Sequence, residues 1–426
     1  MNMHGISRAY AQAKGAFYGW RIAGLMLGPR AGGTGVYIFG STLFILPLEQ
    51  ALGMSRATSS LLFAMANLMS AASAPISGYF MDRVGPRKVL LLSVVVCSLG
   101  YAAFAAADSV TLVFVAFLGP ISLTSLNVAF NVSTAIVNNW FDRNRATAMG
   151  VLQAGAGMGS LIILPILAFA INLWGWRAAA LLGGGIILML GLPGALFAKD
   201  TPEELGLFPD GNTARSNDGA DDRLTGASTR EALRSRAFWL LAMAGVFFGG
   251  AIVAVQVHFV PIMVWRGSSE VTAAAQLTMM AAAGIPQVLF VGWIADRVGR
   301  LTVGAGLSLL AAAGVTLLNA GGGGWTTWVA ALMLAGAQGI YPLTWATVGQ
   351  LFGRRSYSTI RGYLMGLQGL AGVATPVAAG FLFERIGGYT QALWGVAIMW
   401  ALAAVVLTIT LRYASPLPTD QPRARA

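Results

Sequence analysis

The sequence predicts an all-α integral membrane protein with twelve transmembrane helices arranged as two similar six-helix bundles. The first observation is composition: 56% of the 426 residues are hydrophobic, only 10% are charged, and the mean hydropathy is +0.69. Soluble globular domains carry about 25% charged residues. The second observation is a series of long apolar runs, and the third is a tetrapeptide that recurs half a chain length later. Lipid is therefore the expected solvent.

Twelve apolar runs are separated by short segments that contain Arg, Gly or Pro. A bilayer core about 30 Å thick takes roughly 20 helical residues to cross, so each run is long enough. The runs cover 19–46, 58–80, 88–107, 110–138, 147–172, 177–198, 238–264, 271–294, 301–320, 325–351, 362–384 and 391–413. Strands are not expected, because an open sheet edge cannot satisfy its hydrogen bonds in lipid.

One long polar stretch, 199–236, interrupts the series and predicts a cytoplasmic linker. The expected organisation is an N-terminal tail (1–18), a first six-helix bundle (19–198), the linker, a second bundle (237–413) and a C-terminal tail (414–426). Most of the 27 Lys and Arg residues then fall on the side of both termini; the other side holds Arg56, Arg177, Arg266 and Arg385. The positive-inside rule therefore places both termini in the cytoplasm of a multi-pass inner (plasma) membrane protein.

Several function classes are disfavoured. The net charge of +11 does not form a basic patch with interleaved aromatics, so no nucleic-acid partner is expected. Cys97 is the lone cysteine, which excludes disulfides within the chain. An integral-membrane enzyme would need clustered His, Cys, Asp or Glu at membrane depth, and no such cluster is present. We therefore expect no enzyme activity, no catalytic residues, no cofactor and no metal, and a protein that works as a monomer.

The tetrapeptide Asp82-Arg83-Val84-Gly85 returns as Asp296-Arg297-Val298-Gly299, 214 residues later. Each copy follows the second helix of its half, which indicates a duplication. Two like halves with a site between them are typical of an alternating-access carrier. An Asp at a helix end can pair with a helix dipole or a basic residue in one conformation only, so we expect these loops to gate. The alternative is that the basic residues of these loops follow the positive-inside rule and have no role in gating. The gating candidates are Gly78, Asp82, Arg83, Gly85, Arg87, Gly292, Asp296, Arg297 and Gly299.

Gly78, Asp82, Arg83, Gly85, Arg87 and Lys88 resemble the loop 2–3 signature of the major facilitator superfamily. The second copy, which includes Gly292, Asp296, Arg297 and Gly299, resembles its loop 8–9 counterpart. The resemblance implies the major facilitator fold and a secondary transporter. Trp140-Phe141-Asp142-Arg143, followed by Arg145, Ala148, Gly150, Ala154 and Gly155, is similar to the fifth-helix signature of the monocarboxylate porters. Phe17-Tyr18-Gly19-Trp20 resembles part of their first-helix signature. Together these segments resemble the branch that includes the oxalate:formate antiporters.

The chain also departs from that branch. Monocarboxylate porters usually carry an acidic residue ahead of the first-helix signature, a lysine deeper in that helix and charges in helix 8. Here Lys14 and Gly15 precede the signature, Tyr37-Ile38-Phe39 stands near the lysine position, and no charge lies between Val271 and Ala295. Substrate identity and proton coupling are therefore not implied by the resemblance.

Arg30 lies about ten residues into the first helix, roughly 15 Å deep and near the bilayer midplane. An ionised side chain there costs about 2.5 to 3.5 kcal/mol, so it usually faces a cavity or a partner. None of the 16 Asp and Glu residues falls at mid-depth in the predicted spans, which makes a substrate anion the expected counter-charge. Alternatively, Arg30 caps carbonyls near Pro29. Thr34, Tyr37 and Ser41 share its helical face, and Tyr37 is a further binding candidate.

Helix 4 carries a polar stripe at helical spacing: Thr124, Asn127, Asn131, Thr134 and Asn138. We expect Asn127 and Asn131 to line a cavity, the alternative being hydrogen bonds that join helices, each worth about 0.6 kcal/mol. The repeat offset maps this stripe onto Gln338, Tyr341 and Trp345 of helix 10, which predicts a second wall. Aromatic packing between helices is the alternative there.

Gln153, Gln256 and His258 complete the predicted binding residues. His258 is the only histidine in the membrane region, so it or the substrate would carry the proton if transport is proton-coupled. A purely structural, hydrogen-bonded histidine is the alternative.

The leading hypothesis is therefore symport or exchange of a small organic anion, in particular a monocarboxylate, with or without a proton. Efflux of a drug or metabolite is the alternative. It is disfavoured because the Gly-Pro-rich helix 5 motif of drug antiporters is absent: Pro165 lies six residues beyond Gly159.

Overall fold

The structure is a computed structural model that describes residues 17–211, 226–321 and 324–413. The predicted tails and the middle of the predicted linker therefore lie largely outside the described residues. The chain divides into two compact units. The first comprises Met1–Thr225 together with Arg354–Gly362, and the second comprises Gly226–Gly353 and Tyr363–Ala426.

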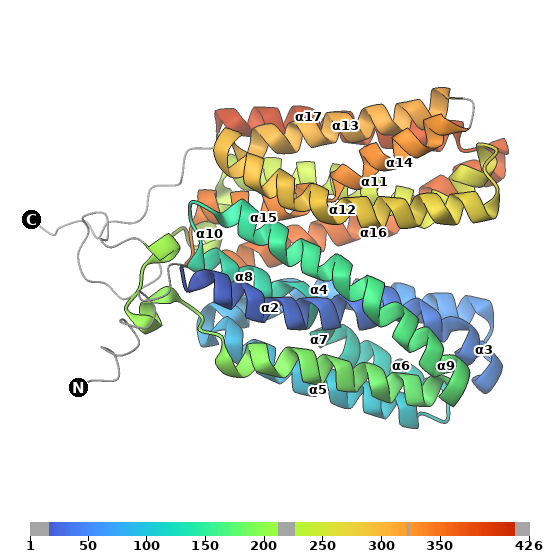
Figure 1. Cartoon of the computed structure of the whole chain (residues 1–426), viewed down its shortest axis with the longest axis horizontal. Helices are drawn as coiled ribbons and strands as arrows, with labels where there is room; N and C mark the ends of the chain where they lie inside the picture. The colour runs from blue at the N-terminus through green and yellow to red at the C-terminus, as the bar shows by residue number, and fades with distance from the viewer. Residues whose placement is uncertain (1–16, 212–225, 322–323, 414–426) are drawn as a thin grey trace, which may run out of the picture. The chain divides into compact units, whose positions relative to one another are not determined.

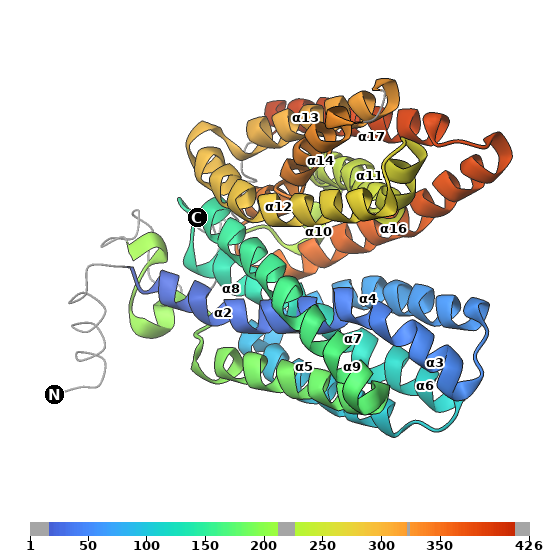
Figure 2. The same cartoon turned by 45° about the vertical axis from the view of Figure 1, so that its right-hand side comes forward.

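The helices of the first unit lie side by side, and α9 packs against both α2 and α5 (Figures 1 and 2). Transmembrane helix 1 runs over Gly19–Leu52 and helix 4 over Val110–Trp140. Both are divided into shorter pieces. In chain order the elements are α2 (Gly19–Gly33), η1 (Thr34–Phe39), η2 (Gly40–Phe44), α3 (Ile45–Leu52), α4 (Arg56–Val84), α5 (Pro86–Ala106), α6 (Val110–Ala116), η3 (Phe117–Ile121), α7 (Ser122–Leu126), η4 (Asn127–Asn131), α8 (Val132–Trp140) and α9 (Arg145–Phe197).

Helix α9 contains two of the predicted transmembrane helices. It is 53 residues long and its backbone breaks at Gly175, where φ is 79° and ψ is 169°. A positive φ of this size favours glycine, which has no Cβ to clash with the backbone. In the part of the chain that the structure describes, 11 helices are long and apolar enough to cross a membrane. The break at Gly175 resolves these into the twelve predicted crossings.

The second unit is built in the same way, with α17 packed against α11 and α13 (Figure 1). Its helices are α10 (Thr229–Arg234), α11 (Arg236–Trp265), α12 (Glu270–Val298), α13 (Arg300–Ala320), α14 (Trp325–Ala337), α15 (Ile340–Phe352), α16 (Tyr357–Ile386) and α17 (Thr390–Arg412). The first residues of α16, up to Gly362, belong to the first unit. Outside these helices the described residues contain one isolated β-bridge, between Gly226 and Gly353.

The duplication extends beyond the tetrapeptide to the start of the preceding helix. Ser55 caps α4 by accepting a hydrogen bond from the N–H of Thr58 at 3.1 Å. Ser269, 214 residues later, caps α12 through Thr272 at the same distance. A serine cap satisfies one of the free N–H groups at a helix start. The second helix of each half therefore begins with a serine cap and ends with the repeated tetrapeptide.

Three π-helical segments interrupt the predicted α-helical spacing: η1 in helix 1, and η3 and η4 in helix 4. Segments of this kind are rare and frequently occur at functional sites. The segment η4 spans Asn127 to Asn131, the two amides predicted to line the cavity. Their side chains, four residues apart, remain neighbours, because Nδ2 of Asn131 lies 2.9 Å from Oδ1 of Asn127.

Candidate functional site

Arg30 lies in α2 with only 3% of its surface exposed. Its Nη2 donates a hydrogen bond to Oε1 of Gln153 at 2.7 Å, and its Nη1 donates to Oγ1 of Thr134 at 3.4 Å. The guanidinium also lies 4.3 Å from the ring centroid of Phe130. Its Nε is buried without a hydrogen-bond partner in the described structure. These contacts are all with neutral groups, so the positive charge is solvated but not neutralised.

A second buried arginine, Arg361, belongs to the same unit. It is also 3% exposed, and its Nη1 donates to Oδ1 of Asn131 at 2.7 Å. Arg30 and Arg361 bind side chains three residues apart in helix 4, Thr134 and Asn131, so two positive charges lie along the same stretch of that helix. Among the described residues of the first unit, three arginines are 3% exposed, Arg30, Arg145 and Arg361, and of these Arg145 forms an ion pair with Asp142 at 3.2 Å.

Arg361 was missed because helix 11 was predicted to begin at residue 362. Helix α16 begins at Tyr357 instead, so Arg361 lies inside the helix and not in the preceding loop. The buried side chains of Tyr357, Ile360 and Leu364 follow the 3 and 4 residue spacing of one helical face. This periodicity is visible in the sequence and predicts the earlier start. The predicted boundary was wrong because the two preceding arginines, Arg354 and Arg355, make the segment resemble a loop.

Asn127 and Asn131 form the centre of a buried polar network. Oδ1 of Asn127 accepts hydrogen bonds from Oγ of Ser77 at 2.7 Å and from Nδ2 of Asn131 at 2.9 Å. Nδ2 of Asn127 donates to Oγ of Ser93 at 3.2 Å. Asn131 therefore connects this network to Arg361. The contacts join helices, as the structural interpretation of the stripe predicts, and they also bring the amides to a cationic site.

Tyr37 lies in a separate network. Its hydroxyl is 2.8 Å from Oγ of Ser70, which in turn donates to the carbonyl of Ser122 at 2.7 Å. The ring is 4% exposed and lies 6.2 Å from that of Phe117. A substrate-binding role for Tyr37 stays a prediction.

His258 lies in the second unit, where both ring nitrogens are engaged. Nε2 is 3.0 Å from the carbonyl oxygen of Pro376, and Nδ1 is 3.1 Å from the hydroxyl of Tyr389. A carbonyl can only accept, so Nε2 carries a hydrogen, while the tyrosine hydroxyl can donate to Nδ1 or accept from it. Both ring nitrogens of His258 therefore have protein partners, the arrangement expected of a structural histidine.

The other second-unit candidates occupy different environments. Gln338 and Gly339 lie between α14 and α15, where both residues keep right-handed helical angles, and helix 10 runs over Trp325–Phe352. The ring of Tyr341 packs edge-on against Phe248 with centroids 5.5 Å apart. Trp345 is buried and Gln256 is exposed. The binding roles of these residues stay predictions.

The two copies of the repeated motif make different contacts. In the first, Oδ1 of Asp82 accepts from the N–H of Ser358 at 3.0 Å, and Oδ2 accepts from the N–H and hydroxyl of Thr359 at 2.8 and 2.6 Å. Asp82 thus caps the start of α16, where a carboxylate is stabilised by the helix dipole. A Cβ on Gly78 would lie 2.3 Å from the carbonyl oxygen of Ser358. Gly78 is therefore required for the close approach.

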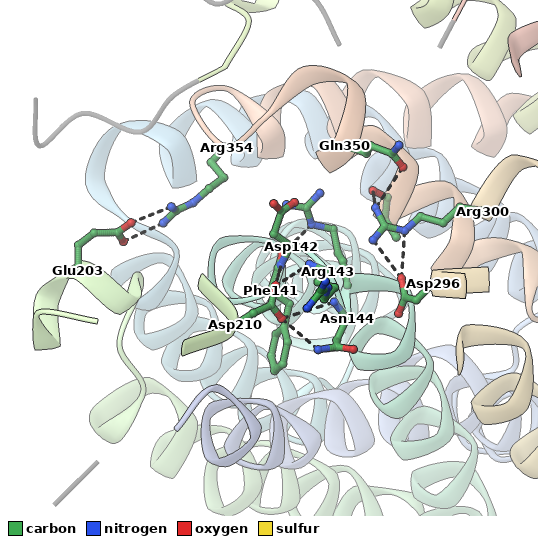
Figure 3. Close-up of polar contacts among 12 residues, drawn as sticks. Phe141, Asp142, Arg143, Asn144, Glu203, Asp210, Asp296, Arg300, Gln350 and Arg354 are labelled. Atoms are coloured by element: carbon green, nitrogen blue, oxygen red, sulfur yellow. Dashed lines mark hydrogen bonds and ion pairs between the residues drawn. The ribbon is translucent and has the colours of Figure 1, made fainter. Parts of the chain in front are cut away.

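In the second copy, Asp296 forms an ion pair with Arg300 at 3.0 Å, and Arg300 also donates to Oε1 of Gln350 at 3.2 Å (Figure 3). The difference follows from one position. The counterpart of Arg300, 214 residues earlier, is Pro86. Because proline cannot form an ion pair with the preceding aspartate, Asp82 is left to cap α16. Arg297 stacks on Trp293 at 3.9 Å, as Arg83 does on Tyr79 at 5.9 Å, while Gly292 is buried within α12.

Gly85 and Gly299 occupy the same left-handed conformation, with φ of 97° and 118°. A Cβ on Gly85 would lie 2.4 Å from Oδ2 of Asp200. Asp200 accepts the N–H of Arg87 at 2.7 Å, and the side chain of Arg87 donates to the carbonyl of Ala195 at 2.8 Å. Burial raises the pKa of Asp200 to about 6, and the neighbouring Glu204 also raises it, while the bond from Arg87 opposes the shift.

The residues that follow α9 form hydrogen bonds and an ion pair with residues of other loops. Oδ2 of Asp210 accepts from the N–H groups of Asp142 and Arg143, and Oδ1 lies 3.3 Å from Nδ2 of Asn144 (Figure 3). Glu203 pairs with Arg354 through two hydrogen bonds of 2.8 and 2.9 Å. Although burial opposes it, this pair holds the pKa of Glu203 below its usual value. The predicted linker is therefore structured at its beginning.

The two short segments that suggested a particular branch lie against one another. The ring of Phe17 is 6.0 Å from Trp140 and 5.6 Å from Phe141, and Trp20 lies 4.8 Å from Phe141. Nε1 of Trp140 donates to the carbonyl of Lys199 at 2.9 Å. One aromatic cluster therefore joins the ends of helices 1, 4 and 6.

The family model of the Major Facilitator Superfamily matches residues 25–376. The chain belongs to this superfamily. It is a transporter family with the predicted fold, which confirms the fold class and the expectation that the protein is not an enzyme. Among solved structures, the proton:xylose symporter XylE has a TM-score of 0.73 at 15% identity and covers 95% of this chain and 97% of its own. The E. coli fucose:proton symporter has a TM-score of 0.70 at 17% identity, covering 92% and 97%.

Curated relatives agree with the predicted branch. Mouse (Mus musculus) monocarboxylate transporter 11 is 28% identical over 346 residues, covering 77% of this chain and 73% of that protein. The oxalate:formate antiporter of Oxalobacter formigenes is 27% identical over 267 residues, covering 61% of this chain and 59% of that protein. The chain therefore spans less than two thirds of the antiporter's length. The resemblance to the monocarboxylate porter and oxalate:formate antiporter branch is confirmed.

Proposed function

We propose that this chain moves a small organic anion, of the monocarboxylate class, across the inner (plasma) membrane by alternating access. The observation that carries the proposal is Arg30, a buried arginine whose hydrogen-bond partners are the neutral Gln153 and Thr134. Two relatives, a monocarboxylate transporter and an oxalate:formate antiporter, support such a substrate.

The geometry at Arg30 allows a substrate carboxylate to replace the amide oxygen of Gln153 as the hydrogen-bond acceptor. The planar guanidinium fork matches a carboxylate and can bind it through two parallel hydrogen bonds. The bond from Arg30 to Gln153 already has a charged donor, and a carboxylate adds the attraction of opposite charges, about 4 kcal/mol at a separation of about 4 Å and an effective dielectric constant of about 20. A substrate carboxylate can therefore displace Gln153 from Arg30, while Gln153 keeps the fork in position when the site is empty.

Proton coupling and anion exchange remain the two mechanisms to separate. Nε2 of His258 is held by the carbonyl of Pro376, so a proton relay through this residue would have to use Nδ1 and the hydroxyl of Tyr389. A proton carried by the substrate, or exchange of one anion for another, requires no such relay.

The repeated loops complete the proposed mechanism as gates. Asp82 holds the start of α16 in the conformation described here, and this contact must break for the helix start to move. The ion pair of Asp296 with Arg300 stays within one end of the second unit. Asp82 is therefore proposed as the changeable contact and Asp296 as the permanent one.

Uptake into proteoliposomes tests the proposal. Radiolabelled formate, acetate, lactate, pyruvate and oxalate would be offered with and without an inward proton gradient, and with unlabelled anion inside. We expect saturable uptake of at least one carboxylate, stimulated either by the gradient or by internal anion, and its loss in Arg30→Ala. Arg143→Ala, which removes an exposed arginine, is the matched control. Carboxylate uptake by Arg30→Ala at the wild-type rate would eliminate the proposed role of Arg30. Transport of a neutral drug in place of every carboxylate would favour efflux.

A further inference from the structure

The first turn of α16 makes two polar contacts with the first unit. Asp82 of α4 binds the backbone N–H groups of Ser358 and Thr359, and Arg361 binds the side chain of Asn131 in helix 4. Between them, Ile360 is fully buried. All of these residues belong to the first unit.

Any movement of the helix backbone at the start of α16 changes both contacts together. An α-helix has 3.6 residues per turn, so Ser358, Thr359 and Arg361 lie within one turn of a rigid backbone. A displacement of the Arg361 end therefore changes the distance from Asp82 to the two N–H groups. The gate contact and the arginine contact are thus mechanically joined.

The Arg361 contact is also sensitive to charge at Arg30. The two guanidinium groups bind Thr134 and Asn131, three residues apart in helix 4, and like charges so placed repel one another. An anion bound at Arg30 replaces repulsion by attraction. The bond from Arg361 to Asn131 already has a charged donor, but a carboxylate adds the attraction of opposite charges and therefore competes well with Asn131.

We propose that Arg361 is a positioning residue that couples substrate binding to the gate. When an anion reaches Arg30, Arg361 turns from Asn131 towards it, the first turn of α16 moves, and Asp82 loses its hold on Ser358 and Thr359. This inference rests on the proposed function, because it requires an anion at Arg30. It adds a residue that senses occupancy and a physical path of one helical turn from the site to the gate.

The proposal differs from a purely structural role for Arg361. A structural arginine would stabilise the start of α16 equally with and without substrate. A coupling arginine makes the packing of that turn depend on substrate, and its removal should impair transport more than it impairs anion binding at Arg30.

Thiol labelling provides the test. The chain has one cysteine, Cys97, which is fully buried inside the first unit, so a thiol introduced by Ser358→Cys would be the one that reports on the start of α16. Its alkylation by a maleimide would be followed in proteoliposomes with and without the carboxylates of the uptake panel. Binding would be measured in parallel by scintillation proximity. Ser358 is itself 5% exposed, so its replacement thiol reacts when the first turn of α16 moves. We expect a bound carboxylate to raise the labelling rate severalfold, Arg361→Gln to bind the anion without this rise, and Arg361→Lys to restore part of it.

The outcomes separate this inference from the function on which it rests. If the Ser358→Cys protein binds a carboxylate through Arg30 but its labelling rate does not change, or if Arg361→Gln shows the full rise, the coupling role is overturned and the anion carrier stands. If no carboxylate binds, or Arg30→Ala binds as well as the wild type, the proposed function fails and the coupling role fails with it. A lower kcat with little change in KM for Arg361→Gln, rescued by Arg361→Lys, is the expected kinetic result.

Discussion

Asp82 and Thr359 are joined by two hydrogen bonds, one to the backbone N–H at 2.8 Å and one to the hydroxyl at 2.6 Å. They lie 277 positions apart in the chain. The contact makes one carboxylate of the duplicated motif the cap of a distant helix, whereas its counterpart Asp296 pairs with Arg300 four residues away.

Asp82→Asn should slow transport more than it weakens substrate binding. The amide keeps an oxygen acceptor but loses the charge that favours a helix N-terminus, an effect of up to about 2 kcal/mol. We expect kcat to fall by up to about tenfold, equivalent to about 1.4 kcal/mol, with KM nearly unchanged. Initial rates of uptake check this, with the exposed Asp108→Asn as control. An unchanged kcat would argue against the gate.

Gly78→Ala should disturb the same contact by steric means. The added Cβ would meet the carbonyl oxygen of Ser358 at 2.3 Å, and backbone cannot move aside as a side chain can. A Cβ on Gly24 meets nothing within 4 Å, so Gly24→Ala is the matched control. We expect Gly78→Ala to label faster at the Ser358→Cys reporter without substrate, and Gly24→Ala to behave as wild type. Equal labelling in both variants would show that the close approach is dispensable.

Arg300→Ala should destabilise the second unit. The side chains of Arg300 and Asp296 are 9% and 5% exposed, and removing one partner of a buried pair typically costs about 3 to 5 kcal/mol. Thermal unfolding in detergent should show a clear fall in Tm, and the double variant Arg300→Ala with Asp296→Ala should recover part of it. Exposed Arg143→Ala serves as the reference. A Tm for Arg300→Ala equal to that of the wild type would contradict the importance of the pair.

Asp200 should give the protein a stability that rises as the pH falls from 7 to 5. Its folded pKa of about 6 exceeds the unfolded value of about 3.9, so the folded state takes up the proton first and gains stability on acidification between these values. The upper limit is about 2 to 3 kcal/mol for a shift of this size. Asp200→Asn keeps an acceptor for Arg87 and should flatten the dependence of Tm on pH in this window. A variant with the same slope as wild type would exclude Asp200 as its source.

The fold was largely predictable because apolar length and duplication both act over many residues. The twelve runs and the repeat identify the helices, and the structure changes their ends by a few residues. Two features were not anticipated. Helices 5 and 6 are separated by Gly175 alone, so α9 contains both. The π-helical turn from Asn127 to Asn131 is a backbone feature that a 3.6-residue period does not predict.

The site was only partly predictable. Arg30, Gln153 and Asn131 were identified from polarity at membrane depth, and the structure places Gln153 on Arg30. Arg361 was missed because two arginines precede it and its helix begins earlier than expected. The capping role of Asp82 could not be located from sequence alone, since the N–H groups it binds carry no side-chain signature.

The most direct test of the account is Gln153→Glu, which places a carboxylate where the neutral partner of Arg30 now lies, 2.7 Å from Nη2. If Arg30 is the anion site, the resident carboxylate neutralises it, and equilibrium binding of radiolabelled substrate should fall to the level of Arg30→Ala while Tm is kept or raised. The wild-type glutamine has nearly the same shape as the introduced glutamate and is the reference for size. Gln153→Met removes the amide without adding a charge, and it should retain much of the binding. Substrate binding by Gln153→Glu with wild-type affinity would contradict the central claim.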